Sequence, residues 1–329
     1  MRYVIGMDGG GSKTECVLVR EDGVLVGHGR GGGVNRNFIS QEGFERSVHD
    51  ALQGALDSAP EVRQLSYVVG SMNCDGTSLR AIAAEYELPP EHMQWIGEAL
   101  PARATAEIAF GRVPDIVVVS GTGSLVAGWG HDGKPHGVGG AGSIVGDEGS
   151  AYWIGVRALT RLVESFDGRR PFDDFAHQLT TALDMADHRT LINRVYGGGV
   201  HPMTRDEIAA VAPHVSRLAN AGDPFACELL AAAAHELAFQ AQAVIRMLNL
   251  REEPVLIQLY GGVFRAGEVI TRPLREEIVT YAPGAELLPA LKCTVIGAAE
   301  LALRAMGVSA SVSTVQRNLL DGGRQHDLI

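Results

Sequence analysis

A glycine motif that recurs later in the chain is the feature that most constrains how this sequence folds. Residues 6–14 read Gly-Met-Asp-Gly-Gly-Gly-Ser-Lys-Thr, with an apolar, β-prone segment on each side. A shorter version, Ser-Gly-Thr-Gly-Ser, occupies residues 120–124 after the strand-like run 116–119. Gly11 and Gly121 are separated by 121 − 11 = 110 positions. The turns Asp22-Gly23 and Asp132-Gly133 have the same spacing, since 132 − 22 = 110. The first half of the chain is therefore predicted to contain a duplicated strand–glycine turn–strand–turn–strand unit.

Neither copy of the motif is one of the common phosphate loops. A Walker loop requires Gly, four residues and then Gly-Lys-Ser/Thr, whereas Lys13 stands one residue out of that register. The residues after the turn alternate like a strand, while Walker and dinucleotide loops open onto a helix. Glycines let a backbone turn sharply and expose its N–H groups, as an oligophosphate requires. Both copies are predicted to be phosphate-binding hairpins; an ordinary glycine-rich hairpin is the alternative.

Length, charge and cysteine content limit the classes of function. A chain of 329 residues is expected to form two domains. The net charge of −11 argues against nucleic acid as a partner, because phosphate backbones require a cationic face. The four cysteines form no Cys-x-x-Cys pair and suggest free thiols in a reducing cytoplasm. We expect a cytoplasmic protein without a signal peptide or a membrane partner, since charged residues interrupt the apolar stretch 229–250.

The order of predicted elements is typical of an α/β protein. Three strands within residues 2–29 precede a helix at 41–58, followed by a strand at 65–70, a helix at 77–87, a strand at 93–97 and a helix at 99–110. The pattern restarts at residue 115 with three more strands. It then becomes mainly helical, with helices at 149–165, 171–185, 188–196, 204–220, 223–249, 265–281 and 297–306 and strands at 255–260 and 285–288. The stretch after residue 309 is expected to be loosely packed.

The first hairpin supplies candidate ligands for a nucleotide and its metal ion. Asp8 ends the first strand, where its carboxylate can hold Mg²⁺ beside bound phosphates, or can form an Asx turn instead. Lys13 can reach a phosphate or remain solvated. The backbone cradle around those phosphates would consist of Gly10, Gly11, Ser12 and Thr14.

Two further segments are candidates for ligand contact. The glycine-rich run 139–150 contains Asp147 and Glu148 just before a helix, and both a bound ligand and a helix-capping role suit carboxylates there. The density of glycine around Asp147 favours a ligand. Gly261 and Gly262 follow a buried strand, at a place where backbone can pass close to an adenine ring.

These motifs together resemble the BadF/BadG/BcrA/BcrD ATPase family, and within it the N-acetylglucosamine kinase branch of the sugar kinase/Hsp70/actin superfamily. The resemblance runs from residues 8–14 through 34–35, 120–124 and 146–155 to 261–262 and 297–299. It implies an α/β fold of two actin-like, RNase H-like lobes, 1–114 and 115–329, with an interlobe cleft for ATP and Mg²⁺. Helix 297–306 is expected to pack back on the first lobe.

The resemblance also assigns roles to individual residues. It implies that Asp8, Gly10, Gly11, Lys13 and Thr14 form the first phosphate loop, Thr122 and Gly123 the second, and Gly261 and Gly262 the adenosine contact. Asn35 and Asp147 match positions that bind sugar hydroxyls, and Glu148 adjoins them. Glu98 stands where the family has its catalytic aspartate, at the end of a strand. Ala141 replaces a tryptophan, and residues 71–75 depart from the usual small glycine-rich turn.

The expected activity is ATP-dependent phosphorylation of a primary hydroxyl of N-acetylglucosamine or glucosamine, with Glu98 accepting the hydroxyl proton. An extra methylene relative to aspartate moves this carboxylate by roughly 1 to 1.5 Å, one bond length, and the smaller Ala141 can make room for that shift. Two alternatives remain open: an ATPase switch of the dehydratase-activator type, and a catalytically altered, nucleotide-dependent sugar sensor. The expected partner is a small sugar, and a homodimer is left open.

Overall fold

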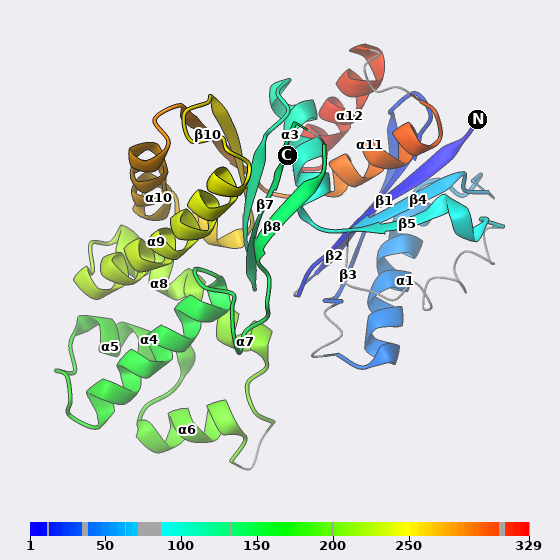
Figure 1. The fold of residues 1–329 in the computed structure, drawn as a ribbon. Helices are drawn as coiled ribbons and strands as arrows, with labels where there is room; N and C mark the ends of the chain where they lie inside the picture. Colours follow the sequence, from blue (N-terminus) through cyan, green and yellow to red (C-terminus); the bar gives the residue numbers. More distant parts are fainter. Residues whose placement is uncertain are drawn as a thin grey trace. The chain divides into compact units, whose positions relative to one another are not determined.

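The computed structural model of the protein describes residues 1–11, 13–34, 39–62, 64–71, 87–131, 133–198, 201–308 and 313–328. Contacts divide the chain into two compact units, one formed by 1–114 with 291–329 and the other by 115–290. The sequence analysis had assigned residues 291–329 to the second lobe. The two units are described separately below, and both are labelled in Figure 1.

The first unit is a five-stranded mixed sheet between two layers of helices. Its strand order is β3-β2-β1-β4-β5, where β1–β2 and β2–β3 are antiparallel and β1–β4 and β4–β5 parallel. The strands span β1 Tyr3–Gly9, β2 Thr14–Arg20, β3 Leu25–Gly31, β4 Tyr67–Ser71 and β5 Met93–Ile96, with a short 3-10 turn η1 at Pro90–His92. The predicted helix at 77–87 lies almost entirely outside the described residues.

Alternation along the central strands separates two cores. Ile5, Met7 and Leu18 face α1 (Gln41–Asp57), whose Phe44 is fully buried, whereas Val4 and Val17 face α11 (Val295–Ala305). Figure 1 shows α1 on one side of the sheet and α11 with α12 (Ser313–Gln325) on the other. The helix α3 (Ala99–Phe110) packs against α11.

The C-terminal segment is better packed than its sequence predicts. The expectation of a loosely packed tail is wrong, because α12 places Val315 and Leu319 in the core beneath α11, with Leu328 beyond them. Residues four apart lie on one face of a helix, so this pair gives α12 a continuous apolar stripe. Two glycines inside α12 masked this signal in the sequence.

The second unit repeats the same sheet and adds helices. Its strand order is β10-β9-β6-β7-β8, which matches the first sheet strand for strand when read from β8 to β10. The strands span β6 Ile116–Ser120, β7 Ser124–Trp129, β8 Pro135–Gly139, β9 Val255–Tyr260 and β10 Ala285–Leu291. The predicted duplication and the α/β fold class are therefore confirmed.

Seven helices described in this unit surround or extend its sheet. They are α4 Ala151–Phe166, α5 Asp174–Leu183, α6 His188–Tyr196, α7 Arg205–Ala209, α8 Ala212–Asn220, α9 Pro224–Met247 and α10 Glu268–Tyr281, with a 3-10 turn η2 at Gly262–Ala266. The single helix predicted at 204–220 is in fact two. Pro213 stands at the start of α8, where its missing N–H costs nothing and its fixed φ favours a new helix.

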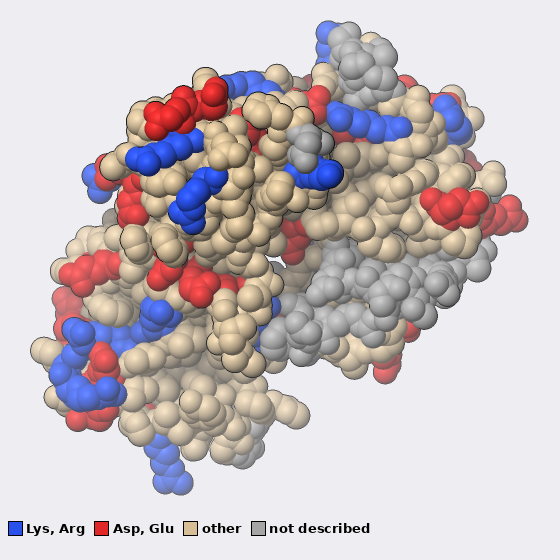
Figure 2. Space-filling model, in the orientation of Figure 1, with Lys and Arg blue, Asp and Glu red and all other residues tan. Residues whose placement is uncertain are grey.

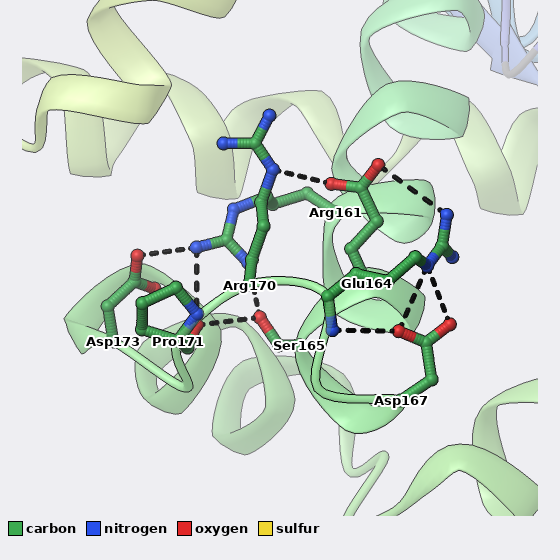
Figure 3. Close-up of polar contacts among 8 residues, drawn as sticks. Arg161, Glu164, Ser165, Asp167, Arg170, Pro171 and Asp173 are labelled. Atoms are coloured by element: carbon green, nitrogen blue, oxygen red, sulfur yellow. Dashed lines mark hydrogen bonds and ion pairs between the residues drawn. The ribbon is translucent and has the colours of Figure 1, made fainter.

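Buried polar contacts tie α5 to the end of α4. Arg161, nearly fully buried, donates to Ser165 in its own helix and to Asp173 Oδ2 at 2.5 Å, and Asp173 is the N-cap of α5 (Figure 3). Glu164 accepts from Arg170 at 2.7 Å beside this contact. Because these bonds connect two helices through one buried guanidinium, they fix the turn between α4 and α5.

The surface charges are mixed. On the face drawn in Figure 2, lysine and arginine side chains are interspersed with aspartate and glutamate, and its described residues show no continuous basic patch. Of the helices within the described ranges, none combines the length and apolarity that crossing a bilayer requires.

Candidate functional site

The first glycine hairpin connects β1 to β2 through a tight turn. The N–H of Gly10 donates to the carbonyl of Lys13 at 2.9 Å, and the Gly10 carbonyl accepts from Val34 at 2.9 Å. A Cβ built on Gly10 would meet nothing closer than the Lys13 carbonyl, 3.9 Å away. Packing within the protein therefore does not require glycine at this position. Ser12 lies outside the described residues.

Asp8 is held by the beginning of α11. Its carboxylate, buried at the end of β1, accepts from the Thr294 hydroxyl at 2.6 Å and from the Thr294 N–H at 3.2 Å, both on Oδ2. Carboxylate oxygens suit Mg²⁺, which is commonly bound by one or two carboxylates together with substrate phosphates. The described residues contain no group of three or more metal-ligating side chains. The Asp8 carboxylate, oriented in this way, can supply one oxygen ligand to such an ion.

Glu15 is a buried carboxylate that the sequence analysis did not select. It lies opposite Asp8 in the β1–β2 register, and its side chain is 2% exposed. Three basic groups contact it: Lys13 Nζ at 2.9 Å, His28 Nε2 at 2.6 Å and Arg30 Nε at 3.1 Å. Burial alone would raise the pKa of Glu15, but these partners outweigh it and lower the pKa to about 2. Half-exposed Lys13 is thus anchored at the base of the hairpin.

The second glycine hairpin connects β6 to β7 and is held by α4. The Gly121 N–H donates to the Gly123 carbonyl at 2.9 Å, and the carbonyls of Gly121 and Thr122 accept from the N–H groups of Ala151 at 2.9 Å and Tyr152 at 3.3 Å. The first turn of α4 thereby satisfies its unpaired donors. The N–H groups of Thr122 and Gly123 donate to no acceptor among the described residues. Two consecutive amides without an acceptor are available to hydrogen-bond an anion.

Asp147 lies behind this hairpin rather than on an open surface. It is 3% exposed, and its backbone is left-handed with φ of 63°. Oδ1 accepts from the Ser124 N–H at 3.2 Å, while Oδ2 pairs with Arg205. A Cβ on Gly123 would lie 2.6 Å from Arg205 Nη2 and 2.8 Å from Asp147 Oδ1. Glycine is therefore required at position 123 by the protein's own packing.

The neighbours of Asp147 also have defined roles. Ser150 is the N-cap of α4, accepting from the Trp153 N–H at 3.2 Å, so Glu148 is not the N-cap considered in the sequence analysis. The Glu148 carbonyl accepts from Ser124 Oγ at 2.7 Å and from Gln240 at 3.1 Å. The loop that carries Asp147 and Glu148 is consequently attached to both β7 and α9.

The β6 and β9 strands bring two predicted contact segments together. They are parallel neighbours with Val119 opposite Tyr260, so the second hairpin and the Gly261–Gly262 turn leave the sheet at the same edge. Gly261 has φ of 123°, and a Cβ there would meet the Ser120 carbonyl at 2.2 Å. A Cβ on Gly262 or Gly121 would meet nothing within 4 Å. The backbone is open at these two glycines, as close ligand approach requires.

Glu98 follows β5, at the same edge of the first sheet as Asp8. Registers pair Asp8 with Ser71 and Ser71 with Ile96, so the ends of β1, β4 and β5 are aligned. Two strand spacings place the start of α3 about 10 Å from β1. Glu98 precedes α3 and is half-buried, but its side chain makes no capping hydrogen bond to that helix. Asn35 lies outside the described residues.

Comparison with known proteins identifies the family. The family model described as the BadF/BadG/BcrA/BcrD ATPase family matches residues 5–302. The chain belongs to this family. It is 30% identical over 269 residues to an N-acetylmuramic acid/N-acetylglucosamine kinase of Clostridium acetobutylicum, covering 80% of this chain and 86% of that protein. It is 25% identical over 313 residues to an N-acetyl-D-glucosamine kinase of Dictyostelium discoideum, covering 91% and 97%.

A solved structure agrees with the fold of this family member. A candidate N-acetylglucosamine kinase from Chromobacterium violaceum superposes with a TM-score of 0.68 at 25% identity, covering 92% of this chain and 99% of that one. The expected family and the expected α/β fold of the actin-like type are thus confirmed. The roles of the individual site residues remain predictions.

Four of the residues that build these sites were missed in the sequence. They are Glu15, Thr294, Arg205 and Asp206. The last lies beside the second hairpin, where burial raises the pKa of its carboxyl although the nearby Thr122 side chain and the charge of Arg205 lower it. None of the four belongs to a glycine motif. Glu15 has the apolar–polar alternation of an ordinary strand, and the other three lie far along the chain from the hairpins that they support.

Proposed function

We propose that this protein is an ATP-dependent amino-sugar kinase that transfers the γ-phosphoryl group to a primary hydroxyl of N-acetylglucosamine or glucosamine. The observation that carries the proposal is the second hairpin, whose consecutive Thr122 and Gly123 amides lie beside the open backbone of Gly262. Relatives 25–30% identical over most of their length are kinases of N-acetylglucosamine or of related amino sugars. Amino-sugar phosphorylation is the activity that unites these two facts.

The nucleotide is bound mainly by backbone groups in this proposal. The phosphates contact Gly10, Gly11, Ser12, Lys13 and Thr14 of the first hairpin and Thr122 and Gly123 of the second, while Gly261 and Gly262 adjoin the adenosine. Asp8 would hold Mg²⁺, which supplies positive charge that neutralises the phosphates. Thr294 fixes the Asp8 carboxylate in one orientation for that purpose.

The acceptor is activated by Glu98. Its carboxylate accepts the proton of the primary hydroxyl as that oxygen bonds to the γ-phosphorus and ADP leaves with the electron pair of the broken bond. Asn35, Asp147 and Glu148 align the sugar ring. Each carboxylate oxygen accepts more than one hydrogen bond, so Asp147 can bind a sugar hydroxyl while it retains Ser124 and Arg205.

The direct test is sugar-dependent release of ADP. Purified protein with ATP and Mg²⁺ is assayed against a panel of N-acetylglucosamine, glucosamine, N-acetylmuramic acid, N-acetylgalactosamine and glucose. We expect ADP release that requires one of the amino sugars and yields its phosphate ester in equal amount. Nucleotide binding without release on any of them would contradict the kinase proposal and favour a sugar sensor.

The role of Glu98 has its own variant and control. Glu98→Gln should lower kcat at least about 100-fold, in line with the contribution of a general base, and leave the affinity for a non-hydrolysable ATP analogue unchanged. Glu91→Gln, which alters an exposed carboxylate just before β5, should match the wild type. Full activity of Glu98→Gln would remove Glu98 from the mechanism.

The dehydratase-activator alternative requires thiolates that can ligate an iron–sulfur cluster. Of the three cysteines in the described ranges, Cys16 and Cys293 are buried, and burial raises the pKa of both thiols. Buried thiols of this kind favour the kinase over the activator. A brown protein after anaerobic purification with iron and sulfide would reverse that preference.

A further inference from the structure

The start of α7 lies against the second hairpin, although 58 residues separate Arg205 from Asp147. The side chains of Arg205 and Asp147 are only 9% and 4% exposed, and they form a buried ion pair. The Arg205 guanidinium also lies 5.9 Å from the ring of Tyr152, in the first turn of α4. Two residues of the run 146–155 therefore contact one arginine that no motif includes.

Asp147 connects Arg205 to the second hairpin. The same carboxylate that pairs with Arg205 accepts the Ser124 N–H, the first amide of β7. Its left-handed backbone, with φ of 63°, is a conformation that a non-glycine residue adopts only at some cost. Removal of the arginine would leave a buried, uncompensated charge, so both the loop and the hairpin would shift.

A second contact from the same helix start acts on the next residue of the hairpin. The partly buried Asp206 carboxyl lies close enough to Thr122 for that side chain to lower its pKa, although burial raises the pKa overall. The beginning of α7 is itself fixed by a capping box, in which the Thr204 side chain and the Glu207 side chain each bond to the other's backbone N–H. The hairpin therefore rests on a locally rigid support.

The space around Gly123 is filled by the side chains that hold the hairpin. The space that a Cβ would occupy is filled by Arg205 Nη2 at 2.6 Å and Asp147 Oδ1 at 2.8 Å. The Thr122 and Gly123 amides, which donate to no described acceptor, are consequently placed by side chains as well as by the turn. A displacement of about 1 Å in such donors is enough to cost about 100-fold in rate.

We propose that Arg205 is a positioning residue for phosphoryl transfer, which through Asp147, and together with Asp206 on Thr122, sets the second hairpin at the distance and angle that the nucleotide phosphates require. The inference rests on the proposed function, because it assigns Arg205 and Asp206 a role in placing the hairpin that binds the nucleotide phosphates in that function. It predicts that substitutions at the start of α7 change nucleotide affinity and the rate of phosphoryl transfer, and not only the stability of the second unit.

The experiment compares Arg205→Met and Arg205→Lys with the wild type. Steady-state kinetics with ATP and the best acceptor of the panel give kcat and KM for each substrate, and calorimetry gives the affinity for a non-hydrolysable ATP analogue. We expect Arg205→Met to lower kcat/KM for ATP about 100-fold and to weaken analogue binding. Arg205→Lys, which keeps the charge but loses the planar fork, should recover part of the loss.

A matched control and a milder variant separate positioning from folding. Arg194→Met removes an exposed arginine of α6, whose Nη2 lies 3.6 Å from Oε1 of Glu207 in α7. Its kinetic constants and analogue affinity should remain within about twofold of the wild type. If Arg205→Met does not fold by circular dichroism, Asp206→Ala takes its place, with an expected loss of about tenfold in analogue affinity, near 1.4 kcal/mol.

The outcomes distinguish the two proposals. A folded Arg205→Met with wild-type kinetics and analogue affinity would overturn the inference while the kinase activity of the wild type stood. An equal loss in Arg194→Met would also overturn it, since any disturbance of α7 would then suffice. A wild type that releases no ADP with any sugar, but whose analogue binding depends on Arg205, would overturn the proposed function and support the inference.

Discussion

The two glycine hairpins have closely related sequences and equivalent places in two sheets of the same strand order, but they are held by different means. The first rests on its own strands: Glu15 on β2 binds Lys13 in the turn and the basic side chains of β3. The second rests on distant segments, with α4 binding its carbonyls and Asp147 joining it to Arg205. The same turn is thus stabilised locally in one unit and by tertiary contacts in the other.

This difference is visible in the glycines. Gly10 has room for a methyl group, whereas Gly123 has none. Packing within the protein does not account for glycine at position 10, whereas it does at position 123; the proposed approach of a nucleotide to the backbone would account for the first. Substitutions at the two positions should separate effects on the nucleotide from effects on stability.

Gly123→Ala should have the largest effect. The added Cβ displaces the Arg205–Asp147 pair, so we expect a loss of about 100-fold in kcat/KM for ATP and of about 3 kcal/mol in the free energy of unfolding, as for a broken buried pair. Kinetics and urea unfolding measure both. A variant as stable and active as the wild type would show that the pair does not hold this hairpin.

Glu15→Gln should weaken the first unit. The folded pKa of Glu15, about 2, lies below the value of 4.5 in the unfolded chain. The ionised carboxylate therefore stabilises the fold above pH 4.5 and loses this contribution as the pH falls toward 2. We expect a loss of about 2 kcal/mol at pH 7, because the pairs with exposed Lys13 and Arg30 are screened. The difference from the wild type should shrink steadily in unfolding curves taken below pH 4.5; a constant difference would contradict this account.

Gly10→Ala should affect the nucleotide alone. The methyl group fits the protein but narrows the approach to the backbone, so we expect about a tenfold higher KM for ATP, equivalent to 1.4 kcal/mol, with an unchanged melting temperature. Gly137→Ala, at an exposed glycine where an added Cβ would likewise meet only a carbonyl 3.9 Å away, serves as a control for the general cost of this substitution. An unchanged KM would indicate that the first hairpin does not contact phosphate.

Glu300→Gln should have the smallest effect and the opposite sign. Glu300 is fully buried in α11, and burial raises its pKa to about 7 against the favourable charge of Arg304. Since the folded pKa exceeds the unfolded value of 4.5, ionisation costs stability as the pH rises from 4.5 to 7. The variant should be more stable than the wild type by about 1 kcal/mol at pH 8, after allowance for the lost pair with half-exposed Arg304. At pH 4 the two should melt together.

Much of the fold could be predicted because its signals are local. The hairpins, the repeat of 110 positions and the helices at 99–110 and 188–196 follow from turn glycines and apolar periodicity, and the last two were placed to the residue. The break at Ala210–Val211 and the packed helix α12 were missed. A proline and a pair of glycines are each compatible with either a helix or a loop, and only the surrounding packing decides between them.

The sequence by itself determined the motifs: the glycines, Asp8 and Glu98 at strand ends, and the family to which the chain belongs. Only the tertiary structure decided what holds them. Thr294 reaches Asp8, and Arg205 reaches Asp147, across 286 and 58 positions. Such pairs produce no periodic pattern in the sequence, because a contact between distant segments depends on how the intervening helices and strands pack. A turn, in contrast, depends only on the few residues that form it.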